Sequence, residues 1–130
     1  NLIVIEHMGR IQMWRIGNTS GITIAGETGV SSSSLSQLSS PVGIIVDKNK
    51  NMYIVDKGNN RIVRWLIGSS EGTIIAGSSS YGLLPYQLNM PNNIRFDRNG
   101  SLLVVDTGNN RIQKFPISCG NLIDHIKTMI

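Results

Sequence analysis

An eleven-residue stretch occurs twice in this chain, in the same register and 50 positions apart. It reads VDKGNNRIVRW at Val55–Trp65 and VDTGNNRIQKF at Val105–Phe115. A shorter copy, MGRIQMW, occupies Met8–Trp14 at an offset of 51, so one residue has been lost or gained between copies. Periods of about 50 residues are typical of solenoids, propellers and arrays. The chain is therefore expected to fold as a series of similar units that stack on one another.

Each unit contains short runs of Val, Ile and aromatic residues, a composition that favours strands. In the best copy these runs are Val42–Asp47, Asn51–Asp56, Arg61–Ile67 and, more weakly, Thr73–Gly77. The first two are nearly continuous in apolar residues, which is typical of strands buried on both faces. Four short antiparallel strands per unit, stacked face to face, predict an all-β fold. We expect a partial β-propeller with four-stranded antiparallel blades.

The repeat divides the chain into predicted blades. Residues 1–27 form a partial first blade, residues 28–77 the second and residues 78–117 the third. Residues 118–130 form a tail, which is either a last strand or a short helix.

Turn-forming residues separate the predicted strands. An Asn-Gly pair ending at Gly100 lies between two apolar runs and predicts a hairpin, because both residues tolerate positive φ. Gly58 and Gly108 can take left-handed angles in the Gly-Asn-Asn turns, and the asparagines tolerate such angles too. Asp47 and Asp97 are interpreted as the starts of hairpins.

The composition limits the classes of protein to which this chain can belong. The chain has 130 residues, of which 40% are apolar and 15% charged, so it is expected to form one domain with a packed core. Its net charge of +4 permits an acidic partner without requiring one, because the basic residues are scattered. No apolar run approaches the length of a membrane span, and no membrane partner is expected. Because the sequence starts at Asn1 without a methionine, we interpret it as a segment of a longer chain.

The repeated pattern resembles the NHL repeat: a proline, then Ile-x-Val/Phe-Asp, a hairpin, and finally a strand that leads into Asp-x-Gly-Asn-Asn-Arg-Ile. The resemblance implies a six-bladed propeller, of which about two and a half blades are present, with the first strand of each blade lining the axis. The first copy departs from the pattern, since Glu6 replaces Asp and the turn is one residue shorter. The matching positions in the two full copies are Pro41, Asp47, Tyr53, Asp56, Asn59, Asn60, Arg61 and Ile62, then Pro91, Asp97, Leu103, Asp106, Asn109, Asn110, Arg111 and Ile112.

A wedge of two or three blades would leave two broad apolar sheet faces open. Apolar patches beyond a few hundred Å² mark an interface or an aggregation hazard. We therefore expect further blades to cover these faces, or the chain to associate with itself.

The most conspicuous polar residues are predicted to be structural. An active site needs a group once, whereas Asp and Arg recur in each blade, so no residue is predicted to be catalytic. A carboxylate at the end of a strand can accept backbone N–H bonds as in an Asx-turn, and an arginine five residues later can pair with it. The structural residues predicted in this way are Asp56, Asn59, Asn60 and Arg61 in one blade, and Asp106, Asn109, Asn110 and Arg111 in the next.

No metal site or other cofactor is predicted. Zinc catalysis needs three converging ligands, and His7 and His125 are the only histidines. Asn92 and Asn93 could offer oxygen ligands near the axis, but no cluster of acidic residues accompanies them. Cys119, the single cysteine, is interpreted as a small buried side chain.

Candidate partner-binding residues lie in turns and loops. Lys57 lies in the turn between the second and third strands, and Tyr81 and Tyr86 lie in the long loop before the third blade. Asn92 and Asn93 complete the set. The serine-rich loop 28–40 is interpreted as either a linker or a ligand-contacting loop.

These observations lead to three functional hypotheses. The first is a scaffold for protein interaction or substrate recognition. The family that the chain resembles often serves in ubiquitin ligases, so the resemblance also implies a ubiquitin ligase-like parent protein. The second, from the same resemblance, is a metal-dependent propeller lyase or hydrolase. The third is binding of single-stranded RNA by a basic propeller face, for which Lys57 lies on one face and other lysines on the opposite one. The sequence indicates neither the partner's identity nor the cellular compartment.

Overall fold

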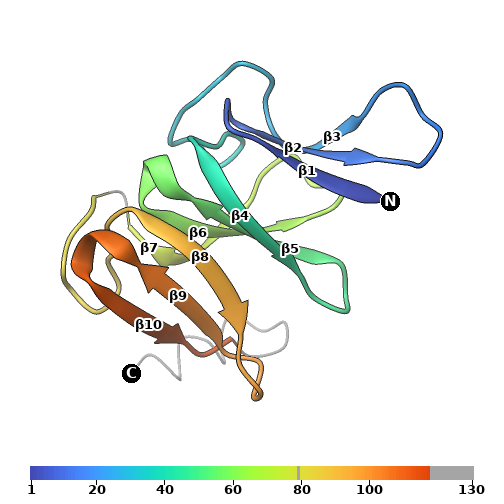
Figure 1. Ribbon diagram of the computed structural model, residues 1–130. Helices are drawn as coiled ribbons and strands as arrows, with labels where there is room; N and C mark the ends of the chain where they lie inside the picture. The colour runs from blue at the N-terminus through green and yellow to red at the C-terminus, as the bar shows by residue number, and fades with distance from the viewer. Residues whose placement is uncertain (79, 118–130) are drawn as a thin grey trace.

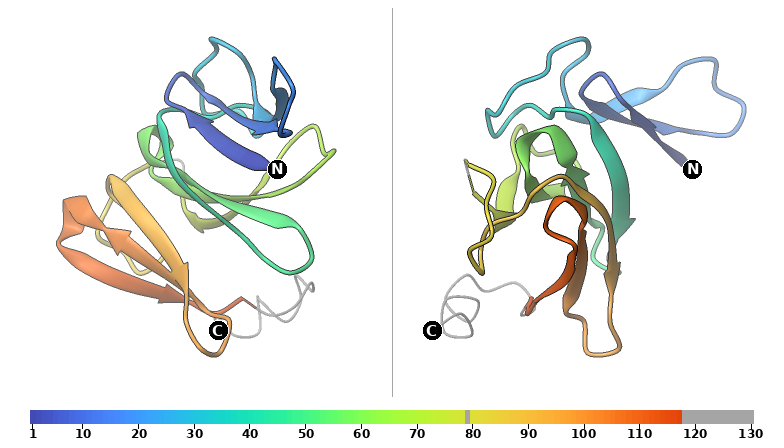
Figure 2. Two further views of the ribbon diagram at one scale, coloured as in Figure 1. Left: turned by 45° about the vertical axis from the view of Figure 1, so that its right-hand side comes forward. Right: turned by 60° about the vertical axis from the view of Figure 1, so that its left-hand side comes forward.

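The computed structural model describes residues 1–78 and 80–117, which form three antiparallel β-sheets in chain order. The predicted tail, with Cys119 and His125, lies outside these residues. Figures 1 and 2 show the three sheets following one another as tilted layers. No helix in the described part of the chain is long and apolar enough to cross a membrane. The expectation of an all-β chain built from stacked antiparallel sheets is confirmed.

The middle sheet, which we call blade 2, is a four-stranded meander of β4 (Pro41–Val46), β5 (Asn51–Asp56), β6 (Arg61–Leu66) and β7 (Thr73–Gly77). Every one of the four runs predicted in this unit is a strand. β5 is buried on both faces from Met52 onward, as its unbroken apolar run predicts.

Blade 3 repeats the first three strands of blade 2. It contains β8 (Pro91–Phe96), β9 (Leu102–Asp106) and β10 (Arg111–Phe115), and Asp106 faces Arg111 across β9 and β10. Asp56 faces Arg61 in the same way in blade 2.

Blade 1 contains β1 (Leu2–Glu6), β2 (Arg10–Trp14) and β3 (Ile22–Gly26), and these strands correspond to β5, β6 and β7. The register shows this, because Glu6 faces Arg10 as Asp56 faces Arg61. Within the described residues, blade 1 therefore has no counterpart of β4.

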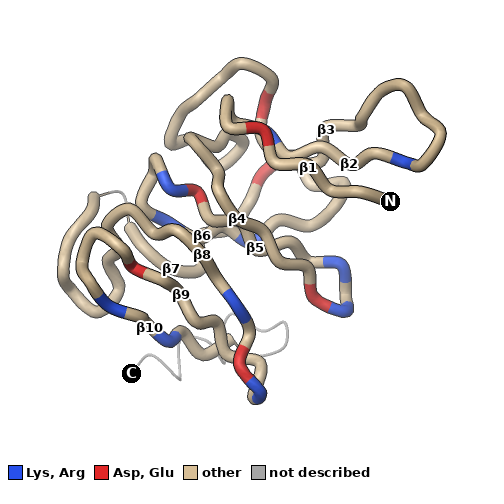
Figure 3. The backbone as a smooth tube through the Cα atoms, in the orientation of Figure 1, with Lys and Arg blue, Asp and Glu red and all other residues tan. Residues whose placement is uncertain are grey.

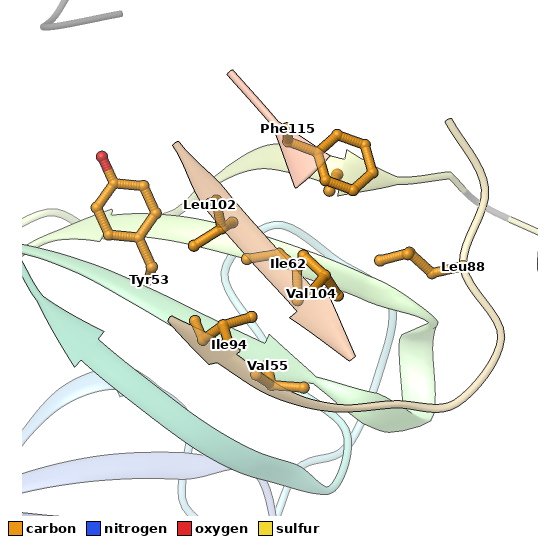
Figure 4. Close-up of a cluster of buried hydrophobic side chains, with 9 residues drawn as sticks. Tyr53, Val55, Ile62, Leu88, Ile94, Leu102, Val104 and Phe115 are labelled. Carbon is orange, nitrogen blue, oxygen red and sulfur yellow. The ribbon is translucent and has the colours of Figure 1, made fainter. Parts of the chain in front are cut away.

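Two hydrophobic clusters hold the sheets together. The cluster between blades 2 and 3 joins Tyr53, Val55 and Ile62 to residues of β8, β9 and β10, and Figure 4 shows the side chains of the two sheets facing one another. A second cluster joins Ile11, Ile24, Ala25 and Leu38 to Met52, Ile54, Val63 and Trp65, and lies between blades 1 and 2. Burial of this kind contributes about 25 cal/mol per Å² of apolar surface, so each blade is stabilised mainly by its neighbour.

The open face of blade 3 is more polar than the expected apolar sheet. Val105 and Ile112 are 38% and 69% exposed, whereas their counterparts Val55 and Ile62 in blade 2 are fully buried. The register places Asn93 beside Val105, and it places Arg95 and Lys114 beside Leu103. In blade 2 the first two of these polar positions hold Gly43 and Ile45.

The open face of blade 1 is likewise mixed. Gln12 occupies the position that Val63 holds in the core of blade 2, and its side-chain oxygen accepts a hydrogen bond from Trp14 Nε1 at 3.2 Å. Both outer faces therefore carry polar positions beside the exposed aliphatic side chains, and are less uniformly apolar than expected.

In the Gly-Asn-Asn turns it is the second asparagine, not the glycine, that takes the left-handed angle. Asn60 and Asn110 have φ of 53° and 52°, each closing a short 3₁₀ turn. Gly58 is needed for space, because a Cβ there would lie 2.8 Å from the carbonyl oxygen of Ser39. The two glycines allow a loop to approach the turn closely.

Candidate functional site: loops held by a repeated Asp–Asn–Arg group

The predicted structural residues of blade 2 converge at the end of β5 and β6. Arg61 Nε lies 2.7 Å from Asp56 Oδ2, and both side chains are almost fully buried. Asn59, in the turn between these strands, donates from Nδ2 to the same carboxylate oxygen at 2.8 Å. The second oxygen of Asp56 accepts the backbone N–H of Ser39 at 2.6 Å. The carboxylate therefore bonds a distant loop as well as its own turn, which differs from the expected Asx-turn.

The remaining donors of this group bind the same loop, residues 31–39, which leads into β4. Arg61 donates from Nη1 to the carbonyl of Ser33 at 2.8 Å, and from Nη2 to those of Ser34 and Gln37 at 3.0 and 3.1 Å. Asn59 donates to the carbonyl of Ser32 at 2.7 Å. We call Asp56, Asn59 and Arg61 the blade-2 clasp, because they hold the incoming loop by its backbone.

Blade 3 has the same arrangement. Asp106, Asn109 and Arg111, the blade-3 clasp, hold the loop that leads into β8. Arg111 Nε lies 2.8 Å from Asp106 Oδ2, and the Asp106 carboxylate accepts the Asn89 N–H at 2.7 Å. The carbonyls of Gly82, Leu83, Leu84 and Gln87 accept bonds of 2.7 to 3.1 Å from Asn109 and Arg111.

Asn60 connects neighbouring blades. Its Oδ1 accepts the backbone N–H of Met90 at 2.9 Å, immediately before β8. The left-handed conformation of Asn60 directs its side chain away from its own clasp and toward blade 3. Asn110 has the same backbone conformation in blade 3.

Burial dominates the electrostatics of the blade-2 clasp. Loss of solvent raises the pKa of the Asp56 carboxyl above its ordinary value, while hydrogen bonds from Asn59, the Ser39 amide and Arg61 act in the opposite direction. Such a buried pair is tolerated because each polar atom has a partner. In the described residues, no buried side-chain nitrogen or oxygen lacks one.

Blade 1 carries a shortened version of the clasp. Three residues rather than four join Glu6 to Arg10, and the guanidinium of Arg10 binds both oxygens of Glu6. Its Nη1 donates to Thr28 Oγ1 at 2.7 Å. Both side chains remain partly exposed, at 34% for Glu6 and 22% for Arg10. No incoming loop binds this pair within the described residues.

The comparisons with known proteins agree with this repeated geometry. The family described as the NHL repeat matches residues 88–115, from the buried Leu88 to the end of β10. This stretch is therefore similar in sequence to an NHL repeat. Residues 38–65 of blade 2 carry the same motif 50 positions earlier, with the same hydrogen bonds. No curated protein is significantly similar to the chain in sequence.

The fold is also found in a solved structure. The chain is similar to an auxiliary nutrient binding protein from Bacteroides thetaiotaomicron, with a TM-score of 0.67 and 18% identity. The match covers 85% of this chain and 33% of that protein, so the chain spans about one third of the length of this structural neighbour. This likeness confirms the expected partial β-propeller.

The two NHL-type clasps hold loops of very different surface character. The loop before blade 3, residues 80–90, has four exposed apolar or aromatic residues, with exposed fractions between 49% and 69%: Tyr81, Leu83, Leu84 and Tyr86. We call it the apolar loop. The positions 50 residues earlier, in the serine loop of residues 28–40, are all serines. The two tyrosines were predicted as partner-binding residues, but the two leucines were not, although the run Leu-Leu-Pro lies in the same loop.

The other candidate residues lie elsewhere. Lys57 is half-buried in the 3₁₀ turn of the blade-2 clasp, beside the serine loop. Asn92 and Asn93 are exposed on β8, and Asn93 Oδ1 accepts the N–H of Ile94 at 2.9 Å. The structure therefore brings Tyr81 and Tyr86 together in one loop but places Lys57 in another blade and both asparagines on a strand.

Charge and metal-binding groups do not gather at one place. Figure 3 shows the basic residues distributed over strands and over loops at both ends of the sheets. Within residues 1–78 and 80–117, no group of three His, Cys, Asp or Glu side chains is placed to hold a metal ion. A cleft of about 350 Å³ lies between β3 and the turn after β6, lined by Met13, Ile24, Trp65 and Ile67 among others. Its polar lining residues are Thr23, Ser69 and Ser70, and it contains no charged side chain.

Proposed function

We propose that this chain is a protein-interaction scaffold that presents the apolar loop to a protein partner. The observation that carries the proposal is the contrast between two loops held by equivalent clasps. Equivalent clasp residues bind the carbonyls of both loops, yet one loop exposes serines and the other exposes two tyrosines and two leucines. Because the clasp does not require apolar side chains there, a contact surface accounts for them.

The way in which the apolar loop is held supports this role. Its carbonyls are bound by Asn109 and Arg111, and Gln113 Nε2 donates to the carbonyl of Pro85 at 3.0 Å. The Tyr86 carbonyl accepts the N–H of Gly77 in blade 2 at 3.0 Å. A loop ordered before binding loses little conformational freedom on association, which favours affinity. Exposed tyrosines on a rigid support are typical of the residues that dominate protein interfaces.

A narrower form of the same proposal is substrate recognition in a ubiquitin ligase-like protein. In that case the transfer chemistry would belong to another domain, and the captured partner would be the substrate. RNA binding receives less support because the basic residues are distributed rather than aligned beside the tyrosines.

The test begins with a photo-crosslinking amino acid in place of Leu83, used to capture and identify the partner in an extract of the source organism. The purified partner is then titrated against the chain by calorimetry. The double variant Leu84→Ser/Tyr86→Ser, which copies the serine loop, should bind at least about tenfold more weakly, since interface anchors each contribute more than about 1 kcal/mol.

The matched control is Ile16→Ser/Leu66→Ser, which removes two exposed aliphatic side chains outside the apolar loop. It should bind the partner as the unmodified chain does. Equal affinities for the two double variants, or the absence of any crosslinked partner, would contradict the proposal.

A further inference from the structure

The hairpins that follow β4 and β8 are a repeated feature in which the clasps and the apolar loop take no part. The blade-2 hairpin reads DKNK at residues 47–50, and the blade-3 hairpin reads DRNG at residues 97–100. Both lie at the end of the sheets opposite the clasps, as Figures 1 and 2 show. Each carries an exposed basic residue at the same position of the repeat, Lys48 or Arg98. The repeat therefore places a positive charge at the tip of each hairpin.

The two hairpins lie side by side. The rings of Tyr53 and Phe96 contact each other edge-on, with their centroids 5.2 Å apart. Phe96 directly precedes the blade-3 hairpin, and Tyr53 lies near the start of β5, just after the blade-2 hairpin. The register places Arg64 of β6 opposite Tyr53. Arg64 therefore lies at the junction between the two hairpins.

The aspartates of these hairpins are bound within their own blades. Asp47 Oδ1 accepts the backbone N–H groups of Asn49 and Asn51, both at 2.9 Å, and its Oδ2 accepts Asn51 Nδ2 at 2.8 Å. Asp97 Oδ1 likewise accepts two backbone N–H groups of its turn, at 2.9 and 2.8 Å. Its Oδ2 lies 3.1 Å from Lys114 Nζ on β10. The two hairpins thus use the second carboxylate oxygen differently.

This difference leaves Arg64 without a carboxylate. Arg64 occupies the position in blade 2 that Lys114 occupies in blade 3, but Asn51 takes the oxygen of Asp47 that would correspond to its partner. The clasp arginines, in contrast, each bind a carboxylate. We call four basic residues the basic junction, and in residues 1–78 and 80–117 none of them forms an ion pair: Lys48, Lys50, Arg64 and Arg98.

The chemistry of the basic junction favours carboxylates over a nucleic acid. Single-stranded nucleic acids are bound by positive grooves in which aromatic side chains stack on the bases. The exposed aromatic residues of the described chain, Tyr81 and Tyr86, belong to the apolar loop at the other end of the sheets. Beside the basic side chains lie exposed amides instead, those of Asn49 and Asn99, which donate hydrogen bonds to carboxylate and carbonyl oxygens.

We propose that the basic junction binds an acidic segment of a partner protein, which runs across the hairpins of blades 2 and 3. Carboxylates of the segment pair with Arg64 and Arg98, since a guanidinium can bind a carboxylate through two parallel hydrogen bonds. Lys48 and Lys50 add positive charge that attracts the segment and speeds its association. This inference goes beyond the proposed function, because the apolar loop lies at the opposite end of the sheets and is tested separately.

The probe is a fluorescein-labelled peptide of sequence ESDGESDGESDG, titrated with the full 130-residue chain and followed by fluorescence anisotropy at about 0.15 M salt. Saturable binding is expected, and it should weaken as the salt concentration rises. The uncharged peptide QSNGQSNGQSNG should not bind, and a labelled oligouridine of equal length should bind more weakly than the acidic peptide. Absence of saturable binding, equal binding of the uncharged peptide, or tighter binding of the oligouridine overturns the proposal.

Two matched substitutions locate the site. Arg98→Glu reverses one exposed charge of the basic junction and should weaken binding of the acidic peptide at least about tenfold. Arg15→Glu makes the same change at an exposed residue in the turn between β2 and β3 of blade 1. It should change the affinity by less than about twofold, because charges are screened within about 8 Å at this salt concentration. Equal weakening by both variants would indicate general attraction to a basic protein and overturns the proposal.

Arg64 distinguishes the junction between the blades from the hairpin tips alone. Arg64→Gln should weaken binding several-fold, and Arg64→Lys, which keeps the charge, should recover most of the loss; urea midpoints of both variants verify that they fold. Nuclear magnetic resonance gives an independent location. Backbone amide signals of residues 47–51 and 97–101 should shift when the peptide is added, and those of the clasp turns, residues 57–60 and 107–110, should not. Shifts at the clasp turns alone overturn the proposal.

Discussion

The buried pair of Asp56 and Arg61 connects the local turn to a loop that is distant in sequence. Its stability depends on complete pairing: the guanidinium binds one carboxylate and three carbonyls, and its planar fork fits all of these acceptors. Arg111 makes the equivalent bonds, but its side chain is 27% exposed, against 5% for Arg61. The two blades thus offer the same interaction at two degrees of solvent exposure.

The first prediction compares these two arginines. Arg61→Gln leaves Asp56 buried without its cation and should lower the free energy of unfolding by about 3 kcal/mol or more. Arg111→Gln should cost about half as much, because water can reach the vacated position. Urea unfolding of the two variants measures the difference. Equal losses would show that solvent exposure does not set the strength of the clasp.

A second prediction concerns Asp97 at the start of the β8–β9 hairpin. The Ser101 N–H, which donates to its carboxylate at 2.8 Å, lowers the pKa of Asp97; partial burial raises it, and Lys114 and the Asn99 N–H lower it further. A lowered pKa in the folded chain contributes stability above the ordinary value of 3.8, and this contribution is lost as pH falls through the folded value.

Asp97→Asn removes that titration. The variant should be less stable than the unmodified chain at neutral pH, and the difference should shrink as the pH falls below 3.8 and through the lowered pKa of the folded chain. Urea midpoints measured at a series of pH values test this. A difference that stays constant down to acid pH would mean that the charge of Asp97 does not stabilise the hairpin.

Residue identities in the repeat predicted the Asp–Arg pairing, because two such groups at the ends of paired strands have few other partners. They did not predict the loop carbonyls that Arg61 binds. The role of Gly58 could not be predicted for the same reason. A glycine suggests a flexible turn, but here the absence of a side chain makes room for Ser39, which lies 19 positions earlier in the chain. Contacts between distant backbone segments leave little trace in residue type.

At the scale of single elements, the bulge between β6 and β7 is maintained by backbone proximity. The register shifts between Ile62 and Val63, and the strand β7 ends at Gly77 with φ +90°. A Cβ at Gly77 would lie 2.8 Å from Arg61 Cα and would overlap the Asn60 carbonyl. Blade 1 repeats this geometry at Gly26, so the bulge belongs to the repeat.

The third prediction separates backbone strain from this overlap. Gly77→Ala should destabilise the chain by about 2 to 4 kcal/mol, because it combines a left-handed alanine with a clash against backbone atoms. Gly68→Ala has a similar φ of +96° but open space around its Cβ, and should cost only about 1 kcal/mol. Thermal unfolding of both variants checks the ranking; a larger effect at Gly68 would contradict it.

The strands were the most predictable elements, because continuous Val and Ile runs at a fixed period allow few alternatives. The loops were less predictable. The apolar and serine loops have the same backbone bonds despite unrelated surfaces, since the clasp binds main-chain carbonyls and not side chains. A loop that is held by its backbone can therefore change its exposed residues without changing its shape.

At the scale of the whole molecule, each blade is stabilised by the next, and the outer faces differ chemically from the inner ones. Ile62 is buried between blades 2 and 3, whereas Ile112 at the equivalent position lies on the open face. Ile62→Ala should lower the free energy of unfolding by about 2 to 5 kcal/mol, and Ile112→Ala by less than about 0.5 kcal/mol. Urea unfolding at low protein concentration tests this fourth prediction. Equal losses would show that Ile112 is covered in solution.

The last prediction concerns association through the open face of blade 3. Val105 and Ile112 offer apolar contact area, but Arg95 and Lys114 lie on the same face, and a symmetric pair would bring like charges together. Lys114 is neutralised only in part, by Asp97 at 3.1 Å. Self-association should therefore be weak at about 0.1 M salt and stronger at about 1 M, where repulsion is screened. Sedimentation velocity should show this trend, and Ile112→Lys should abolish it. Association that weakens as salt rises would instead indicate that attraction between opposite charges brings the copies together.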